Sequence, residues 1–161
     1  MSARGLNCYV GAVAAALGLP PDAYCSEVDK LCTAYVALEH RFPGHVDLDV
    51  ALLWDEERGW TVAIETLTVD DPVMLAYLGA DILPDPGAVV AFVQQLVAGE
   101  IPAQRSAPAL RCRGDNDGLA QRLILSNRER SRRQHGTRPR IPEIMKRIPG
   151  ILAGAGSANA R

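Results

Sequence analysis

Six arginine side chains between residues 128 and 140 are the strongest chemical feature of this 161-residue sequence. Guanidinium groups neutralise phosphates and release counterions, which gives an affinity for nucleic acid that does not depend on base sequence. The cluster therefore predicts a nucleic-acid-binding segment made of Arg128, Arg130, Arg132, Arg133, Arg138 and Arg140. A solvated basic tail, or a tail that folds back on an acidic part of the same chain, explains the same residues without nucleic acid.

Residue types that bind metals gather between residues 25 and 45. They are Cys25, Cys32, His40 and His45. Structural zinc sites typically hold two cysteines separated by about two to four residues, a pair that this sequence lacks. The other two cysteines, Cys8 and Cys112, lie far from each other along the chain. We therefore expect reduced thiols, no bound metal and no other cofactor.

Two carboxylates, Asp47 and Asp49, would share one face of an extended strand and could bind a divalent cation or act in acid–base catalysis. Most of the other acidic residues lie beside predicted turns, where solvated charge is the ordinary explanation. The sequence contains no nucleophile elbow, phosphate-binding loop, dinucleotide-binding fingerprint or zinc-protease motif. A metal-dependent enzyme using this pair therefore ranks last among the function classes, and we expect no catalytic residue.

The elements that would position these residues begin with a helix. Apolar residues recur at helical spacing from residue 6 to residue 17, and Gly18 ends the pattern. Residues 24–38 fit either one helix or two strands joined by a turn near residue 30, and we favour the strands because of their β-branched and aromatic residues. A second helix begins with Asp85 as N-cap and ends at Gly99.

The clearest strand signal is a hairpin. Residues 50–54 and 60–66 are apolar and rich in strand-forming types, and the five-residue loop between them ends in Gly59. The two tryptophans that flank this loop, Trp54 and Trp60, are predicted to be buried opposite each other. Residues 73–78 continue the sheet.

Together these elements predict an α+β fold, a small antiparallel sheet with the N- and C-terminal helices packed on one face. Residues 5–100 form an acidic domain, residues 101–118 a linker, and residues 119–161 a basic tail that is partly helical or disordered. Four basic residues face 15 acidic ones in residues 1–100, a balance of −11, whereas residues 101–161 have a balance of +9. The two parts therefore differ in electrostatic character.

Apolar side chains on both faces of the predicted strands leave an exposed patch, because two helices cover only one face. The patch consists of Leu53, Met74 and Leu78. Monomers seldom leave a large apolar patch open to water, so a protein partner or a second copy of the chain is expected to cover it. The apolar stripe within residues 141–152 could cover it instead.

Three stretches of the sequence resemble a family of small actinobacterial proteins of unknown function. They are residues 35–38 (YVAL), residues 51–56 (ALLWDE) with the Gly59-Trp60 pair, and residues 75–79 (LAYLG). The hairpin with its tryptophans is the most specific of the three. The resemblance covers about residues 5–100 and implies an intracellular actinobacterial protein with no established activity.

The sequence also bears on location. No apolar run reaches the ~18 residues that a membrane-spanning helix needs, and the apolar N-terminal stretch lacks the cleavage site of a signal peptide. We therefore expect a cytoplasmic protein without membrane contact. The leading hypothesis is a non-enzymatic interaction or assembly module, and the alternative is a protein that binds nucleic acid through its arginine-rich tail.

Overall fold

The computed structural model of the chain describes residues 3–65, 72–100, 104–112 and 116–134. The chain divides into two compact units, Met1–Asn127 and Arg128–Arg161, and the sheet belongs to the first unit. In chain order the elements are α1 (Ala3–Ala16), β1 (Tyr24–Val28), β2 (Cys32–Leu38), β3 (Asp49–Asp55), β4 (Gly59–Glu65), β5 (Val73–Tyr77), α2 (Pro86–Val97) and α3 (Asn116–Gln134).

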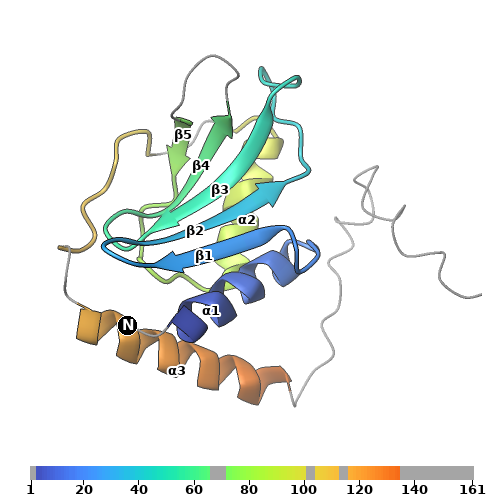
Figure 1. Ribbon diagram of the computed structural model, residues 1–161. Helices are drawn as coiled ribbons and strands as arrows, with labels where there is room; N and C mark the ends of the chain where they lie inside the picture. The colour runs from blue at the N-terminus through green and yellow to red at the C-terminus, as the bar shows by residue number, and fades with distance from the viewer. Residues whose placement is uncertain (1–2, 66–71, 101–103, 113–115, 135–161) are drawn as a thin grey trace, which may run out of the picture. The chain divides into compact units, whose positions relative to one another are not determined.

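The five strands form one antiparallel sheet in the order β1-β2-β3-β4-β5, so that each strand pairs with its neighbours in sequence. Helices α1 and α2 pack on the same face of this sheet (Figure 1). The predicted α+β class and the strand interpretation of residues 24–38 are therefore confirmed.

Alternation along the strands explains which face is covered. On β2, β3 and β4 every second side chain points toward the helices and is buried. These side chains are Cys32, Ala34, Val36, Leu38, Val50, Leu52, Trp54, Trp60, Val62 and Ile64. They meet the apolar stripes of the two helices in one core, as the period of two in strands and 3.6 in helices requires.

The two tryptophans of the hairpin are central to this core. Trp54 and Trp60 lie directly opposite each other in the register of β3 and β4, and they are 1% and 0% exposed, which confirms the prediction. Trp54 Nε1 donates a hydrogen bond to the Ile82 carbonyl at 2.7 Å. Trp60 Nε1 donates to the Tyr9 hydroxyl, which in turn donates to the Pro84 carbonyl, both at 2.9 Å. Both buried indole N–H groups are thus satisfied.

A bulge changes which side chains of β5 face the helices. The register of β4 and β5 shifts between Val62 and Ala63, so that Ala76 is fully buried while Met74 and Tyr77 both face the uncovered side. Strict alternation, which would put Met74 and Ala76 on the same side, is therefore wrong here, because a bulge inserts one extra residue into one strand of a pair.

The chain continues along the same unit after α2. The Tyr77 N–H donates to the Gln104 carbonyl at 3.0 Å, and the Leu110 N–H donates to the Glu57 carbonyl at 2.9 Å. Residues 104–112, which the sequence suggests as a linker, are thus hydrogen-bonded to β5 at one end and to the β3–β4 turn at the other.

The first part of α3 also contributes to the core. Leu119 and Leu123 are each 1% exposed, and Leu123 lies against Gly5 of α1. Asn127 Nδ2 donates to the Gly5 carbonyl at 3.2 Å. Residues 119–127, the part of the expected tail that lies in the first unit, therefore form a helix that packs against the core.

Candidate functional site

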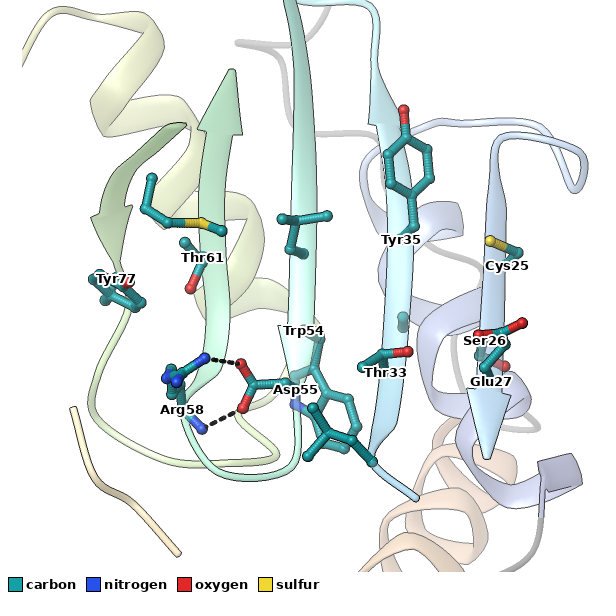
Figure 2. Close-up of a pocket in the computed structure, with 14 residues that line it drawn as sticks. Cys25, Ser26, Glu27, Thr33, Tyr35, Trp54, Asp55, Arg58, Thr61 and Tyr77 are labelled. Carbon is teal, nitrogen blue, oxygen red and sulfur yellow. Dashed lines mark hydrogen bonds and ion pairs between the residues drawn. The ribbon is translucent and has the colours of Figure 1, made fainter. Parts of the chain in front are cut away.

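The face of the sheet opposite to α1 and α2 contains a hollow of ≈ 570 Å³. Figure 2 shows that its lining side chains come from all five strands. One lining residue from each strand, with a second from β5, outlines it: Cys25, Tyr35, Leu53, Thr61, Met74 and Tyr77.

Small side chains lie on this face in the middle of β3 and β4. Ala51 and Ala63 lie opposite each other in the register of β3 and β4, and both point away from the helices. They are nonetheless only 1% and 0% exposed, and Thr61 on the same face is 3% exposed. Tyr35 and Leu53, which lie opposite each other in the register of β2 and β3, line the hollow.

One end of the open face is acidic. Asp49 and Glu65 are directly opposite each other at the ends of β3 and β4, and both are exposed. Like charges in such a pair destabilise a sheet. The Arg41 guanidinium approaches Asp49 only to 3.9 Å, and both side chains are largely exposed, so that this ion pair is weak.

Tyr35 extends the acidic end into the hollow. Its hydroxyl donates a hydrogen bond to Glu65 Oε1 at 2.9 Å. Burial raises the pKa of Tyr35 to about 12, and the hydrogen bond and negative charge of Glu65 act in the same direction. The phenol therefore stays neutral and serves as a donor, not as a base.

The other end of the open face is the β3–β4 turn. Asp55 Oδ1 accepts hydrogen bonds from the backbone N–H groups of Glu57 and Arg58, which fixes the turn in the way that aspartate side chains commonly do. The Arg58 guanidinium lies 3.6 Å from Asp55 Oδ2, as the dashed lines in Figure 2 indicate, and it stays half exposed. The positively charged guanidinium of Arg58 thus lies at the rim of the hollow.

The lining of the hollow includes a thiol and charged groups. Cys25 is an exposed thiol, and catalytic cysteines generally need a neighbouring base such as histidine. None of the described residues that line this hollow is a histidine. Apolar and aromatic side chains line the hollow together with the charged groups of Glu27, Asp55 and Arg58, and such a mixture is also found at protein contact surfaces.

A buried ionisable cluster lies away from the hollow, and sequence reasoning missed it. Glu56 is 2% exposed, and no hydrogen-bond partner for its Oε2 exists among the residues that the structure describes. The Arg111 guanidinium lies 3.9 Å from that oxygen and also donates to the Glu56 carbonyl at 3.3 Å. The sequence predicted that Glu56 lies in a solvated turn. No pattern near Glu56 in the sequence indicates that residues 104–112 return to cover it.

Cys32 completes this cluster. Its backbone carbonyl accepts a hydrogen bond from the Glu56 N–H at 3.1 Å. Burial raises the pKa of the Cys32 thiol, and the charge of Glu56 raises it further, so that the thiol stays protonated and unreactive. The cluster ties residues 104–112 to the hairpin.

The residues considered for zinc do not come together as a set. Cys25 is exposed on the open face, whereas Cys32 is buried on the helix-covered face. Within residues 3–65, 72–100, 104–112 and 116–134, no group of three or more His, Cys, Asp or Glu side chains is placed to hold a metal ion. Asp47 lies in the turn before β3 and Asp49 is the first residue of that strand, and both are exposed.

The candidate interface residues separate in the structure. Leu53 and Met74 both line the hollow, and Met74 is 43% exposed. Leu78 follows β5, packs partly buried against the core, and donates its N–H to the Trp60 carbonyl at 3.0 Å. The open face thus brings together two of the three residues.

The candidate arginines lie in the second unit. Arg128 and Arg132 are exposed one turn apart on α3, Arg130 is partly buried, and Arg133 belongs to the same helix. Arg138 and Arg140 lie outside the described residues. No helix in the described part of the chain is long and apolar enough to cross a membrane.

A second hollow, of ≈ 420 Å³, lies at the end of α2 and shares Met74 with the first. Its lining includes Phe42, His45, Leu96, Glu100 and Arg105. The opposite charges of Glu100 and Arg105, together with an apolar wall, do not select one ligand class.

Comparison with known proteins gives one match. A model described as a family of unknown function (DUF6292) matches residues 9–95, which hold the whole sheet and the open-face hollow. No curated protein and no solved structure matches the chain. The resemblance to a family of unknown function over about residues 5–100 is thereby confirmed, and the actinobacterial origin stays a prediction.

Proposed function

Because this chain belongs to the DUF6292 family of unknown function, we propose a function from its own geometry: a non-enzymatic protein-interaction module. Its contact surface is the open face of the sheet, and it acts within an assembly rather than on a substrate. The module works in the cytoplasm, since three exposed free cysteines, Cys8, Cys25 and Cys112, suit a reducing compartment.

The observation that carries this proposal is the apolar hollow on the open face. Its lining includes Leu53, Met74 and the rings of Tyr35 and Tyr77. Aromatic residues and methionine are enriched at protein interfaces, where they bury much apolar area at a modest cost in conformational entropy. Such a surface is expected to be covered when the protein is at work.

Site-specific photo-crosslinking in living cells tests the proposal. A photoreactive amino acid replaces Met74 on the open face, and the matched control replaces Gln95, an exposed residue of α2 in the other layer. The expected result is a protein adduct from position 74 that is absent from position 95. Equal adducts from both positions, or none from position 74, would contradict the proposed contact surface.

A second candidate function rests on α3. Arg128 and Arg132 are four residues apart, so they lie on the same side of the helix, and both are exposed. Two exposed guanidinium groups at this spacing could contact successive phosphates, which favours the alternative of a nucleic-acid-binding protein.

A further inference from the structure

Charged side chains lie at both ends of the β3–β4 hairpin on the open face. Asp49 and Glu65 lie at its open end, where Arg41 approaches Asp49 to 3.9 Å, and Arg58 lies in its turn, where it pairs with Asp55. Strand β3 has seven residues, so at about 3.3 Å per residue the two ends are separated by about 20 Å. Since β3 is the middle strand of five, the hairpin runs through the centre of the face.

We propose that the open face binds the open face of a second copy of this chain, through a two-fold axis that lies between the sheets and runs across the strands. This inference rests on the proposed function and names its partner. A two-fold dimer uses the same patch on both copies, so the patch must be complementary to itself. The carboxylates of Asp49 and Glu65 at one end of the hairpin can pair with Arg58 of the second copy in one orientation of the axis.

The direction of the axis decides which charges meet. An axis across the strands reverses their direction but keeps each strand over its own counterpart. The hairpin of one copy then lies over that of the other, turn against open end. Arg58 faces Asp49 and Glu65 of the second copy, and the reciprocal contact forms at the other end. An axis along the strands would instead stack the two acidic ends, and the repulsion of four carboxylates opposes that arrangement.

The apolar part of the face fits the same arrangement. Leu53 lies near the middle of the central strand, with Tyr35 beside it on β2 and Thr61 on β4. An axis near Leu53 brings this side chain against its own copy, and two sheets packed face to face interdigitate such side chains at a separation of about 10 Å. Arg58 is half exposed and lies 3.6 Å from Asp55, so its guanidinium is able to take a second acceptor.

Charge reversal on the full-length chain tests the proposal, with mass measured by light scattering over a range of concentrations. The wild type is expected to dimerise. R58E puts like charges together at both ends, and so does the double change D49R with E65R. Each variant should dimerise at least about tenfold more weakly. Asp22→Arg, an exposed charge reversal outside the hollow, is the control and should leave dimerisation unchanged.

A mixture of the two variants gives the decisive result. In the mixed dimer, the glutamate introduced by R58E in one copy meets the two introduced arginines of the other. The native Arg58 of that other copy meets the native carboxylates of the first. Mixing should therefore restore dimerisation to within about threefold of wild type. Restoration also shows that both variants are folded. If a reversal unfolds the chain, R58Q and E65Q are used, and each should still weaken the dimer severalfold.

A wild type that stays monomeric at every concentration overturns the second copy as the partner. A dimer that withstands both reversals, or that mixing does not restore, overturns the axis. Neither result alters the crosslinking test, in which an adduct from position 74 still supports the open face as a contact surface. The two proposals therefore fail separately.

Discussion

Single buried residues of the hairpin account for much of the stability of the sheet. Trp60 is fully buried, donates to the Tyr9 hydroxyl, and packs against the Tyr9 ring with centroids 6.1 Å apart. Removing a buried aromatic side chain costs its transfer free energy and leaves a cavity. Truncation at this position therefore acts on the core and on the hydrogen bond between sheet and helix.

Trp60→Ala should lower the free energy of unfolding by about 3–5 kcal/mol. Urea denaturation followed by circular dichroism measures this change. Ile124→Ala serves as the control, because this α3 side chain is 51% exposed and its loss should cost less than about 1 kcal/mol. Equal losses for the two variants would contradict the burial of the indole.

His40 makes the folded state sensitive to acid. Burial lowers the pKa of His40, although the charge of Glu39 acts in the opposite direction, and its Nδ1 has no hydrogen-bond partner among the described residues. A histidine whose pKa is lower in the folded than in the unfolded state binds fewer protons when folded. Its contribution to stability is therefore fully present above about pH 6.5 and is lost as the pH falls toward the folded pKa.

The free energy of unfolding should therefore decrease between about pH 7 and 5, before most carboxylates titrate. His40→Asn removes the titrating group and should flatten this part of the curve, whereas His45→Asn should leave the decrease in place. Urea midpoints measured across the range check the prediction. A decrease that persists unchanged in His40→Asn would assign it to other groups.

At the level of the element, the β3–β4 turn depends on a glycine. Gly59 has φ of +74°, where a side chain is strained. A Cβ there would also meet the Asp81 carbonyl at 3.2 Å and a methyl group of Leu110 at 3.3 Å. The turn therefore needs glycine for its own conformation and for the close approach of residues 104–112.

Gly59→Ala should destabilise the fold by about 2–3 kcal/mol, of which the strain accounts for about 1–2 kcal/mol. Gly18→Ala is a matched control: Gly18 has φ of +78°, but, apart from its chain neighbours, no atom of the described residues would lie within 4 Å of a Cβ at this position. The control should show the cost of strain alone. Thermal unfolding of both variants measures the difference, and a smaller loss at Gly59 than at Gly18 would contradict the close packing.

At the level of the whole molecule, the two units differ in charge and in proposed role. The described surface of the first unit has an acidic end at Asp49 and Glu65. In α3 the second unit presents Arg128 and Arg132 to solvent. The two proposed roles thus fall on different units of the chain, and they are open to separate tests.

Any affinity for nucleic acid should depend steeply on salt. About six to ten phosphate contacts predict a loss of about 10³–10⁵ in affinity between ~50 and ~200 mM salt. Fluorescence anisotropy with a labelled duplex measures it, and Arg128→Glu with Arg132→Glu should weaken binding at low salt. Arg41→Glu, in the first unit, is the matched control. Binding that ignores salt, or that survives the double change, would exclude these arginines as its cause.

Local patterns in the sequence determined most of the elements. Helical periodicity predicted α1, the N-cap at Asp85 predicted the start of α2, and Gly59 between two β-rich runs predicted the hairpin with its buried tryptophans. These features follow from the preferences of neighbouring residues for particular backbone angles. Since neighbours along the chain carry that information, it is present in the sequence alone.

Only the tertiary structure decided how those elements share their surfaces. The bulge in β5 turns Met74 and Tyr77 to the open face, the return of residues 104–112 buries Glu56, and α3 brings Leu119 into the core. Each depends on contacts between residues far apart in sequence, such as Glu56 and Arg111. No local pattern encodes such a contact, because burial is a property of the folded chain and local periodicity is a property of its segments.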